Sequence, residues 1–213
     1  MRQIFQEIPS TNERLRLQNP NLWDSILAFE QHQGRGRRGN DWVSPKGGFY
    51  FSICSPQHKL LPLIAGLSSK LSLESFHQFN VSLKWPNDLI LDGKKLGGIL
   101  CESHNDFAIV GVGINIVTSP DVPSSISLND IGVSINLLDL ADKFENILKR
   151  ELMNFDSNDF FISYRKAEIL LGKNVRWNGS EGIVIDITEN GELMVEENNN
   201  IITLNAEEVH LEH

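Results

Sequence analysis

The sequence has little cysteine and no long apolar run. Its two cysteines, Cys54 and Cys101, have no metal-ligand spacing, so we expect both to be free thiols. No apolar stretch reaches the roughly 18 residues from which a membrane-spanning helix is inferred. The opening MRQIFQEIPSTNE also lacks the apolar segment of a secretory signal. These absences predict a globular cytoplasmic protein whose cysteines are reduced.

Basic residues are missing from the last part of the chain. The net charge is −9, and segment 177–213 contains nine Asp and Glu without any Lys or Arg, so residues 1–176 are neutral overall. Within this neutral part, three arginines between residues 35 and 38 lie close to Lys46, and Asp41 opposes them. A protein that coats duplex DNA needs a broad basic face, which this distribution does not supply. We therefore expect a small anionic ligand and no DNA binding.

The hydrophobic pattern predicts a larger α+β domain. Helices are expected at 10–18, at 60–79 and over most of 138–171, and strands at 27–33, 48–54, 81–85, 88–91, 94–103 and 107–116. The first helix begins with Ser10 and Glu13 at capping-box spacing, and Asp92-Gly93 predicts a type I′ hairpin turn. Strands and helices do not alternate regularly. The expected fold is therefore a mixed or antiparallel sheet with helices packed on it.

A change of pattern after Gly172 predicts a second, smaller domain. Short strands separated by turn residues follow at 175–177, 182–188, 192–197 and 201–205, as in a small β-barrel. We place the boundary between residues 1–171 and 172–210. The final Leu211-Glu212-His213 resembles the remnant of a purification tag.

The loop GRGRRG at residues 34–39 is the part of the sequence that points most directly to a function. Its glycine spacing matches a dinucleotide-binding pattern, but the following NDWVSPKGG contains Pro45 and two glycines and does not predict the required helix. A kinase glycine loop is also excluded, because Asp41 stands where valine is expected. A solvated surface loop would explain neither the glycines nor the adjacent Trp42. Glycines let the backbone wrap a ligand, and guanidinium groups match phosphate and carboxylate, so the loop is typical of an anion clasp.

Four motifs in order resemble the biotin protein ligase family: GRGRRG followed by tryptophan, KWPNDL, KKLGGILCE and GVGINI. STN at 10–12 and Gln31 agree with them, and the resemblance is dense over residues 8–118. It implies a catalytic domain of the class II aminoacyl-tRNA synthetase/biotin synthetase type, with an SH3-like C-terminal barrel. It also implies that biotin and ATP give biotinyl-5′-AMP with Mg²⁺ present, after which biotin passes to a carrier lysine.

The resemblance assigns one group of residues to biotin and to the reacting carboxylate. Its members are Ser10, Thr11, Asn12, Gln31, Arg35, Gly36, Arg37 and Lys95. The first four would bond the ureido end and the valerate chain, although a helix cap and a strand position would also explain them. Arg37 and Lys95 are the expected catalytic residues, because adenylation must neutralise a carboxylate beside a triphosphate. Lys94 is expected to be an exposed hairpin residue.

A second group is assigned to the nucleotide. Its members are Arg37, Arg38, Trp42, Lys84, Asn87 and Asn115, and Asp88 is expected either to bind magnesium or to position Lys84. Trp42 would offer its ring to adenine, although an ordinary core tryptophan explains it as well. Trp85 is expected to pack in the core. Glycines 97, 98, 111 and 113 would let strands run close beneath the ligand, although ordinary sheet packing would also explain them.

Two other functions remain open at this point. A lipoate protein ligase shares the fold and the adenylate strategy, although KWPND argues against it. A non-catalytic anion- or nucleotide-binding module would explain the arginine-rich loop but not Lys95 together with STN and Gln31. The resemblance further implies the biotin carboxyl carrier domain of acetyl-CoA carboxylase as the partner, and it allows a homodimer. Because the STN motif begins at residue 10, no N-terminal DNA-binding domain is expected.

Overall fold

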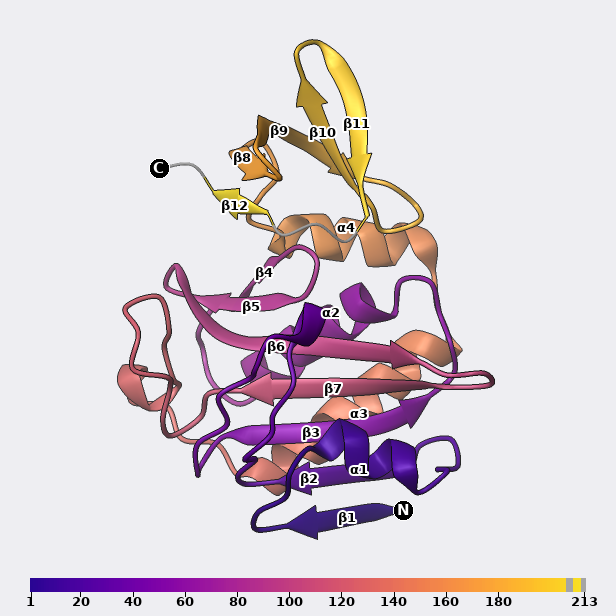
Figure 1. Ribbon diagram of the computed structural model, residues 1–213, viewed down its shortest axis with the longest axis vertical. Helices are drawn as coiled ribbons and strands as arrows, with labels where there is room; N and C mark the ends of the chain where they lie inside the picture. Colours follow the sequence, from indigo (N-terminus) through magenta and orange to yellow (C-terminus); the bar gives the residue numbers. More distant parts are fainter. Residues whose placement is uncertain (206–208, 212–213) are drawn as a thin grey trace.

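A seven-stranded sheet forms the larger part of the molecule (Figure 1). The computed structural model describes residues 1–205 and 209–211. The strand order is β1 (Arg2–Phe5), β2 (Ser25–Ala28), β3 (Phe49–Ser55), β7 (Ala108–Ile114), β6 (Lys94–Ser103), β5 (Asp88–Leu91) and β4 (Ser82–Lys84). Strands β1 and β2 are parallel, and every other neighbouring pair in this sheet is antiparallel. The predicted mixed sheet is therefore confirmed.

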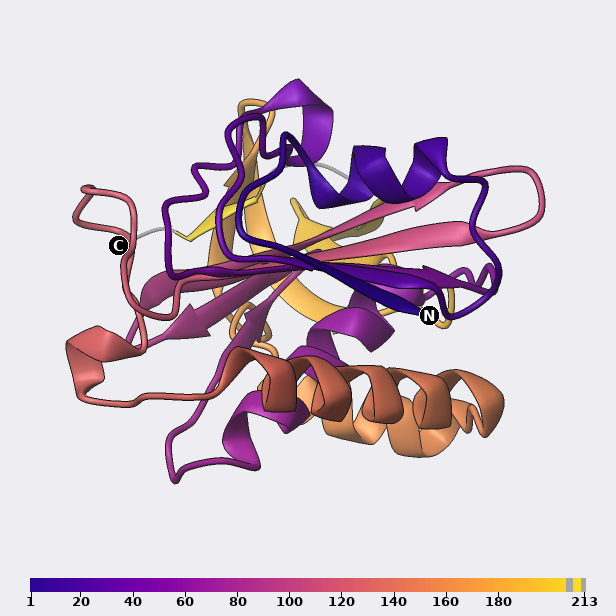
Figure 2. The same ribbon diagram turned by 90° about the horizontal axis from the view of Figure 1, so that it is seen from below.

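Helices cover the two faces of this sheet unequally. Figure 2 shows α1 (Thr11–Leu17) on one face, and α2 (Leu61–Glu74), α3 (Leu137–Met153) and α4 (Ser157–Ala167) on the other. The alternation along β3 explains the division. Phe49, Phe51 and Ile53 point into the core beneath α2 and α3, whereas Tyr50 and Cys54 join a smaller apolar cluster beneath α1.

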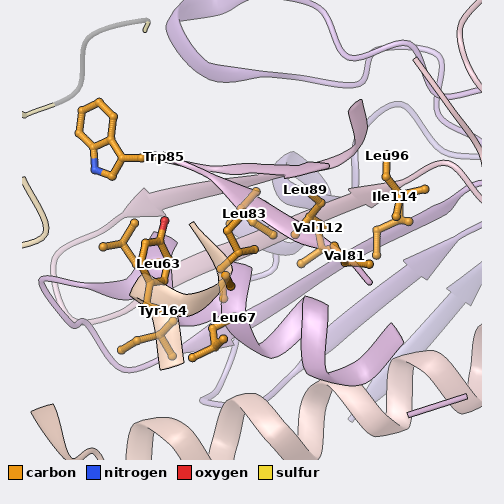
Figure 3. Close-up of a cluster of buried hydrophobic side chains, with 14 of the residues drawn as sticks. Leu63, Leu67, Val81, Leu83, Trp85, Leu89, Leu96, Val112, Ile114 and Tyr164 are labelled. Carbon is orange, nitrogen blue, oxygen red and sulfur yellow. The ribbon is translucent and has the colours of Figure 1, made fainter. Parts of the chain in front are cut away.

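The main core continues from the sheet into the C-terminal part of the chain. Figure 3 shows a section of it, in which Leu67 of α2, Leu83 of β4 and Val112 of β7 are labelled. The same cluster also contains Val175 and Val195 of the second sheet. Burial of these side chains stabilises the fold by about 1.5 to 3 kcal/mol for each fully buried aliphatic residue.

The second sheet is antiparallel and five-stranded. Its order is β11 (Asn200–Leu204), β10 (Leu193–Glu197), β9 (Ser180–Ile187), β8 (Asn174–Trp177) and β12 (His210–Leu211). Among the described residues the pairing does not join β11 to β12, so the expected barrel is an open sheet here. Leu211 pairs with Val175 and belongs to this sheet, while the remaining two residues assigned to a tag lie outside the described part.

Polar contacts connect the second sheet to the larger part of the molecule. The Trp85 indole Nε1 donates to the Gly191 carbonyl at 2.8 Å, and Arg165 of α4 pairs with Asp186 of β9 at 2.6 Å. Trp85 is 2% exposed, as expected for a packing residue. The division at residues 171 and 172 stays a prediction, because these contacts and the shared core join the parts on either side.

Several elements agree with the sequence predictions and a few do not. Ser10 caps α1 as predicted, accepting from Glu13 N at 3.4 Å, and positive φ angles at Asp92 and Gly93 fit the type I′ turn. The helix predicted to reach residue 79 ends at Glu74, and the strand predicted over 27–33 is β2, which ends at Ala28. The pattern also missed β1 and β12, whose pairing depends on partners distant in the sequence.

The cysteines agree with the expectation of free thiols. Cys54 and Cys101 are free, and burial raises the pKa of the Cys54 thiol to about 11, which keeps it protonated at neutral pH. In the described part of the chain, no helix combines the length and apolar character needed to cross a membrane. The short 3₁₀ turns are η1 (Arg37–Gly39) and η2 (Asn129–Ile131).

Candidate active site

A cavity of about 400 Å³ opens on the face of the larger sheet that α1 covers. Its walls come from α1, from the loop 34–41, from the turn between β4 and β5, and from strands β6 and β7. We call residues 34–41 the arginine loop. The predicted site residues that line the cavity are Ser10, Thr11, Asn12, Gln31, Arg35, Gly36, Arg37, Arg38, Trp42, Lys84, Asn87, Asp88 and Lys95.

One end of the cavity is a network of neutral polar side chains. Ser52 of β3 is fully buried, and its hydroxyl donates to Asn12 Oδ1 at 2.6 Å and lies 2.7 Å from Thr11 Oγ1. Gln31 Oε1 accepts from the Thr11 backbone at 2.8 Å, and Gln31 Nε2 donates to Ser44 Oγ at 3.0 Å. These bonds hold amides and hydroxyls in fixed orientations. Such an end suits an uncharged ligand group with both donors and acceptors.

Glycines form the floor of the cavity. A Cβ at Gly111 would overlap the side-chain amide of Asn12, and one at Gly113 would lie 2.5 Å from the Trp42 indole nitrogen. At Gly98 a Cβ would lie 3.4 Å from the same indole. Glycine at positions 111 and 113 therefore lets α1 and Trp42 approach the sheet closely, and the role of these glycines beneath a ligand stays a prediction.

The arginine loop is closed by backbone hydrogen bonds at its base. Gly36 N donates to Asn40 O at 2.7 Å, and Trp42 N donates to Gly34 O at 2.9 Å. The tip turns through Arg38 and Gly39, which both have positive φ. A non-glycine residue rarely adopts this conformation, so the turn at Arg38 stores backbone strain.

The turn between β4 and β5 faces the arginine loop across the cavity. Asn87 Oδ1 accepts from Arg37 Nη1 at 3.1 Å, and Asn87 Nδ2 donates to Ile99 O at 3.0 Å. The Asp88 carboxylate pairs with Lys95 Nζ at 2.7 Å. That ammonium also lies 5.4 Å from the centre of the Trp42 ring. Lys95 and Trp42 are therefore close neighbours, and a ligand placed between them must separate them.

Asn115 is the predicted site residue that does not line this cavity. It is 1% exposed, and its Nδ2 donates to Ser125 Oγ at 3.2 Å and to Ile126 O at 3.1 Å. Its amide thus holds segment 125–126 in this structure, and the nucleotide role stays a prediction. Lys94 is exposed, as expected.

Three residues contribute to the site without having been predicted. Ser52 and Glu102 contact Asn12, and Val209, from the C-terminal part of the chain, lines the cavity although it is 2% exposed. Ser52 lies opposite Gly111 in the register of β3 and β7, which places it below Asn12. Glu102 ends the motif KKLGGILCE, so its place in that motif was a signal, whereas Ser52 stands outside the four motifs.

Two carboxylate residues line the cavity: Asp41, which is exposed on the arginine loop, and Asp88, which pairs with Lys95. Among the described residues no three His, Cys, Asp or Glu side chains come together as a metal site. Magnesium in nucleotide sites is commonly held by one or two carboxylates together with substrate phosphates. The residues present therefore fit an ion that a nucleotide brings with it.

Comparison with known protein families finds a match over the segment that contains most of the cavity-lining residues. Residues 4–116, just over half of the chain, match the biotin/lipoate A/B protein ligase family. The chain belongs to this family. This match confirms the family expected from the motifs. The matched segment, residues 4–116, contains every residue that we predicted for the site.

Similar proteins within the ligase family are named for biotin. A biotin–[acetyl-CoA-carboxylase] ligase of Paracoccus denitrificans is 37% identical over 127 residues, which cover 53% of this chain and 53% of that relative. The enzyme of the same name from Mycobacterium tuberculosis is 28% identical over 209 residues, covering 87% of this chain and 79% of that protein. The match therefore spans about half the length of the Paracoccus relative and more of the second.

A solved structure extends the likeness to nearly the whole fold. It is that of biotin protein ligase from Aquifex aeolicus in complex with biotin and ATP. The TM-score is 0.88 at 29% identity, and the match covers 99% of this chain and 98% of that one. The similarity therefore includes the second sheet as well as the part that holds the cavity.

Proposed function

We propose that this protein is an ATP-dependent biotin protein ligase, which forms biotinyl-5′-AMP and transfers biotin to a lysine of a carrier protein. One observation carries the proposal. A single cavity joins a neutral polar end, formed around Asn12 and Gln31, to a cationic part that contains Arg37 and Lys95. Biotin has the matching chemistry, with a neutral ureido group at one end and a carboxylate at the other. The biotin ligase relatives and the Aquifex structure with biotin and ATP support the same assignment.

The first step joins two anions. A biotin carboxylate oxygen attacks the α-phosphorus of ATP, the bond to the β-phosphate oxygen breaks, and pyrophosphate leaves. Arg37 and Lys95 are the cations that we assign to the approaching oxygens, because preorganised donors stabilise charge that is spread over the phosphoryl group. Lys95 must leave Asp88 and the Trp42 ring to reach them. The ring then has room for a ligand group, and we assign adenine to it.

The second step releases AMP. The amine of a carrier lysine attacks the acyl carbon of the mixed anhydride, the bond to the phosphate oxygen breaks, and the amine loses a proton. Until then the adenylate must be kept from water, because its anhydride hydrolyses. We assign this protection to the arginine loop, whose closed base and glycine-rich tip allow it to cover the cavity.

Asp88 is the residue that we assign to magnesium, which would supply charge neutralisation for the phosphates. Lys84, Arg38 and Asn87 complete the assignment to the phosphates and the nucleotide, with Asn115 as a further proposed nucleotide contact. Ser10, Thr11, Asn12, Gln31 and Gly36 complete the assignment to biotin, and Arg35 lies beside them, paired with Glu102 at 3.2 Å. We further propose the carrier of acetyl-CoA carboxylase as the partner, a cytoplasmic location and catalysis without DNA binding.

The deciding experiment is isotope exchange between ATP and pyrophosphate, measured with biotin, with lipoate and with no acid, in the presence of Mg²⁺. Exchange that requires biotin is the expected result. Exchange with lipoate alone would assign the protein to lipoate activation instead. Absence of exchange with either acid, in a folded sample, would leave a binding module and overturn the proposal.

Replacing Arg37 by glycine is expected to speed the escape of the adenylate about tenfold. Arg37 bonds Asn87 across the cavity, so its loss removes a contact that holds the loop tip against the opposite wall. A charge-assisted hydrogen bond of about 1.5 to 3 kcal/mol accounts for a change of this size. The measurement is the rate at which preformed labelled adenylate dissociates. Lys46→Gly, which removes an exposed basic residue near the loop, is the control, and equal escape from wild type and Arg37→Gly would contradict the clasp.

A further inference from the structure

Glu102 of β6 lies between two parts of the cavity wall. Its Oε2 accepts from Asn12 Nδ2 at 2.8 Å, and its Oε1 lies 3.2 Å from Arg35 Nη2. The Glu102 side chain is 23% exposed, Asn12 is 4% exposed and the Arg35 side chain is 51% exposed, so the contact with Asn12 is the better shielded from water. One carboxylate thus touches the neutral end of the cavity and the base of the arginine loop.

The contact with Asn12 decides which way its amide points. Asn12 Oδ1 faces the Ser52 hydroxyl at 2.6 Å, and a hydroxyl either donates or accepts, so this partner alone permits both orientations. A carboxylate only accepts, and therefore it selects the orientation with Nδ2 toward Glu102. The Leu100 carbonyl favours the same orientation but is more distant, at 3.4 Å.

The contact with Arg35 anchors the loop. Arg35 also lies 3.5 Å from a Glu13 carboxylate oxygen, so its guanidinium is placed between two acidic side chains. The Arg16 guanidinium keeps the pKa of the Glu13 carboxyl below its ordinary value, which keeps that carboxyl ionised at neutral pH. With two carboxylates beside it, Arg35 is a poor ligand for a further anion. It is better suited to hold the start of the arginine loop in place, next to the backbone hydrogen bond from Trp42 N to Gly34 O.

We propose that Glu102 is a positioning residue, which orients the Asn12 amide for the ligand and holds Arg35 as the fixed base of the arginine loop. The part that concerns Asn12 rests on the proposed function, with the ureido group of biotin as the ligand group that this amide meets. The part that concerns Arg35 does not depend on the ligand. It also gives Arg35 a different role from the carboxylate contact that the family resemblance implied.

Two variants separate the two contacts. Glu102→Gln keeps a carbonyl acceptor for Asn12 but removes the ion pair with Arg35, whereas Glu102→Ala removes both. Tryptic cleavage of the ligand-free protein at Arg35, Arg37 and Arg38, followed by mass spectrometry, reports the hold on the loop. We expect cleavage at least threefold faster in both variants, and no change in Asp106→Asn, which alters an exposed carboxylate in the next turn. Cleavage at the wild-type rate in both variants would overturn the role toward Arg35.

Biotin affinity, measured by calorimetry, reports the role toward Asn12. The Kd is expected to rise about tenfold in Glu102→Ala and to stay within threefold of wild type in Glu102→Gln. Rescue by glutamine distinguishes orientation of the amide from loss of charge. Unchanged affinity in Glu102→Ala, or an equal loss in both variants, would overturn this role. Wild-type protein that binds no biotin would overturn the proposed function and this role together, while the cleavage result would still decide the hold on Arg35.

Discussion

Lys95→Ala is expected to lower the rate of biotin-dependent ATP–pyrophosphate exchange by about 10²- to 10³-fold, the loss typical when one preorganised donor is removed from a charged transition state. The ammonium enters the cavity from β6, where it pairs with Asp88 at 2.7 Å and lies 5.4 Å from the centre of the Trp42 ring. Arg37, the other cation that we assign to the reacting oxygens, enters from the arginine loop and is bonded to Asn87. The measurement is initial exchange rate at saturating biotin and ATP.

Lys94→Ala is the matched control for this substitution. It removes the same side chain one residue earlier in the same strand, where the residue is exposed. We expect exchange within about twofold of wild type for Lys94→Ala, since an exposed charge contributes little to a site from which water screens it. Equal activity of Lys95→Ala and Lys94→Ala would remove Lys95 from the mechanism.

Glu168→Gln is expected to make the protein more stable than wild type at pH 8, by up to about 3 kcal/mol in the free energy of unfolding. Glu168 follows α4 directly and is 7% exposed, and its Oε1 accepts from Leu170 N at 3.0 Å. Burial raises the pKa of this carboxyl from 4.5 to about 7, although hydrogen bonds from its neighbours act in the opposite direction. Glutamine keeps the acceptor and carries no charge, so it avoids the cost of the buried ion.

The direction of the pH dependence follows from the two protonation states. Below pH 4.5 the carboxyl is neutral in the folded and in the unfolded chain, and it contributes no penalty. Between pH 4.5 and about 7 the unfolded chain loses the proton while the folded chain retains it, so stability falls as pH rises. Urea unfolding of wild type and Glu168→Gln at pH 4 and pH 8 measures the effect. Glu196→Gln controls for the loss of an exposed carboxylate, and a difference independent of pH would contradict the expectation.

The parts of the fold that could be predicted from the sequence are those specified by local chemistry. The cap at Ser10, the Asp92-Gly93 hairpin and the apolar strands follow from rules that act within a few residues. Strand β1 could not be predicted in this way, because four residues carry little pattern and its partner β2 is more than twenty residues away. Strand β12, at the edge of the C-terminal sheet, could not be predicted either, because it is too short to show a sequence pattern.

The residues of the candidate site also differ in how far local sequence identifies them. Residues of the compact motifs, such as Lys95 and Asn87, were identified and do line one cavity. Ser52 was missed because its importance depends on strand register: Gly111 pairs with both Ser52 and Leu100, and this places Asn12 between β3 and β6. Glu102 lies in the motif KKLGGILCE, but its role becomes evident only from its hydrogen bond with Asn12 of α1. Asn115 shows the opposite case. It lies inside the motif GVGINI, but its amide is bonded to Ser125 and Ile126 and it does not line the cavity.

The contact between Trp85 and the second sheet has a consequence for how the protein unfolds. Trp85 is the first residue of the turn that carries Asn87, and its indole is bonded to Gly191 within an apolar cluster that continues into β8, β9 and β10. Separating the second sheet would expose this ring and leave its N–H without a partner, which costs more than the contact itself contributes. The two sheets should therefore melt in one cooperative transition, and a chain shortened before β8 would expose apolar surface beside the turn that carries Asn87.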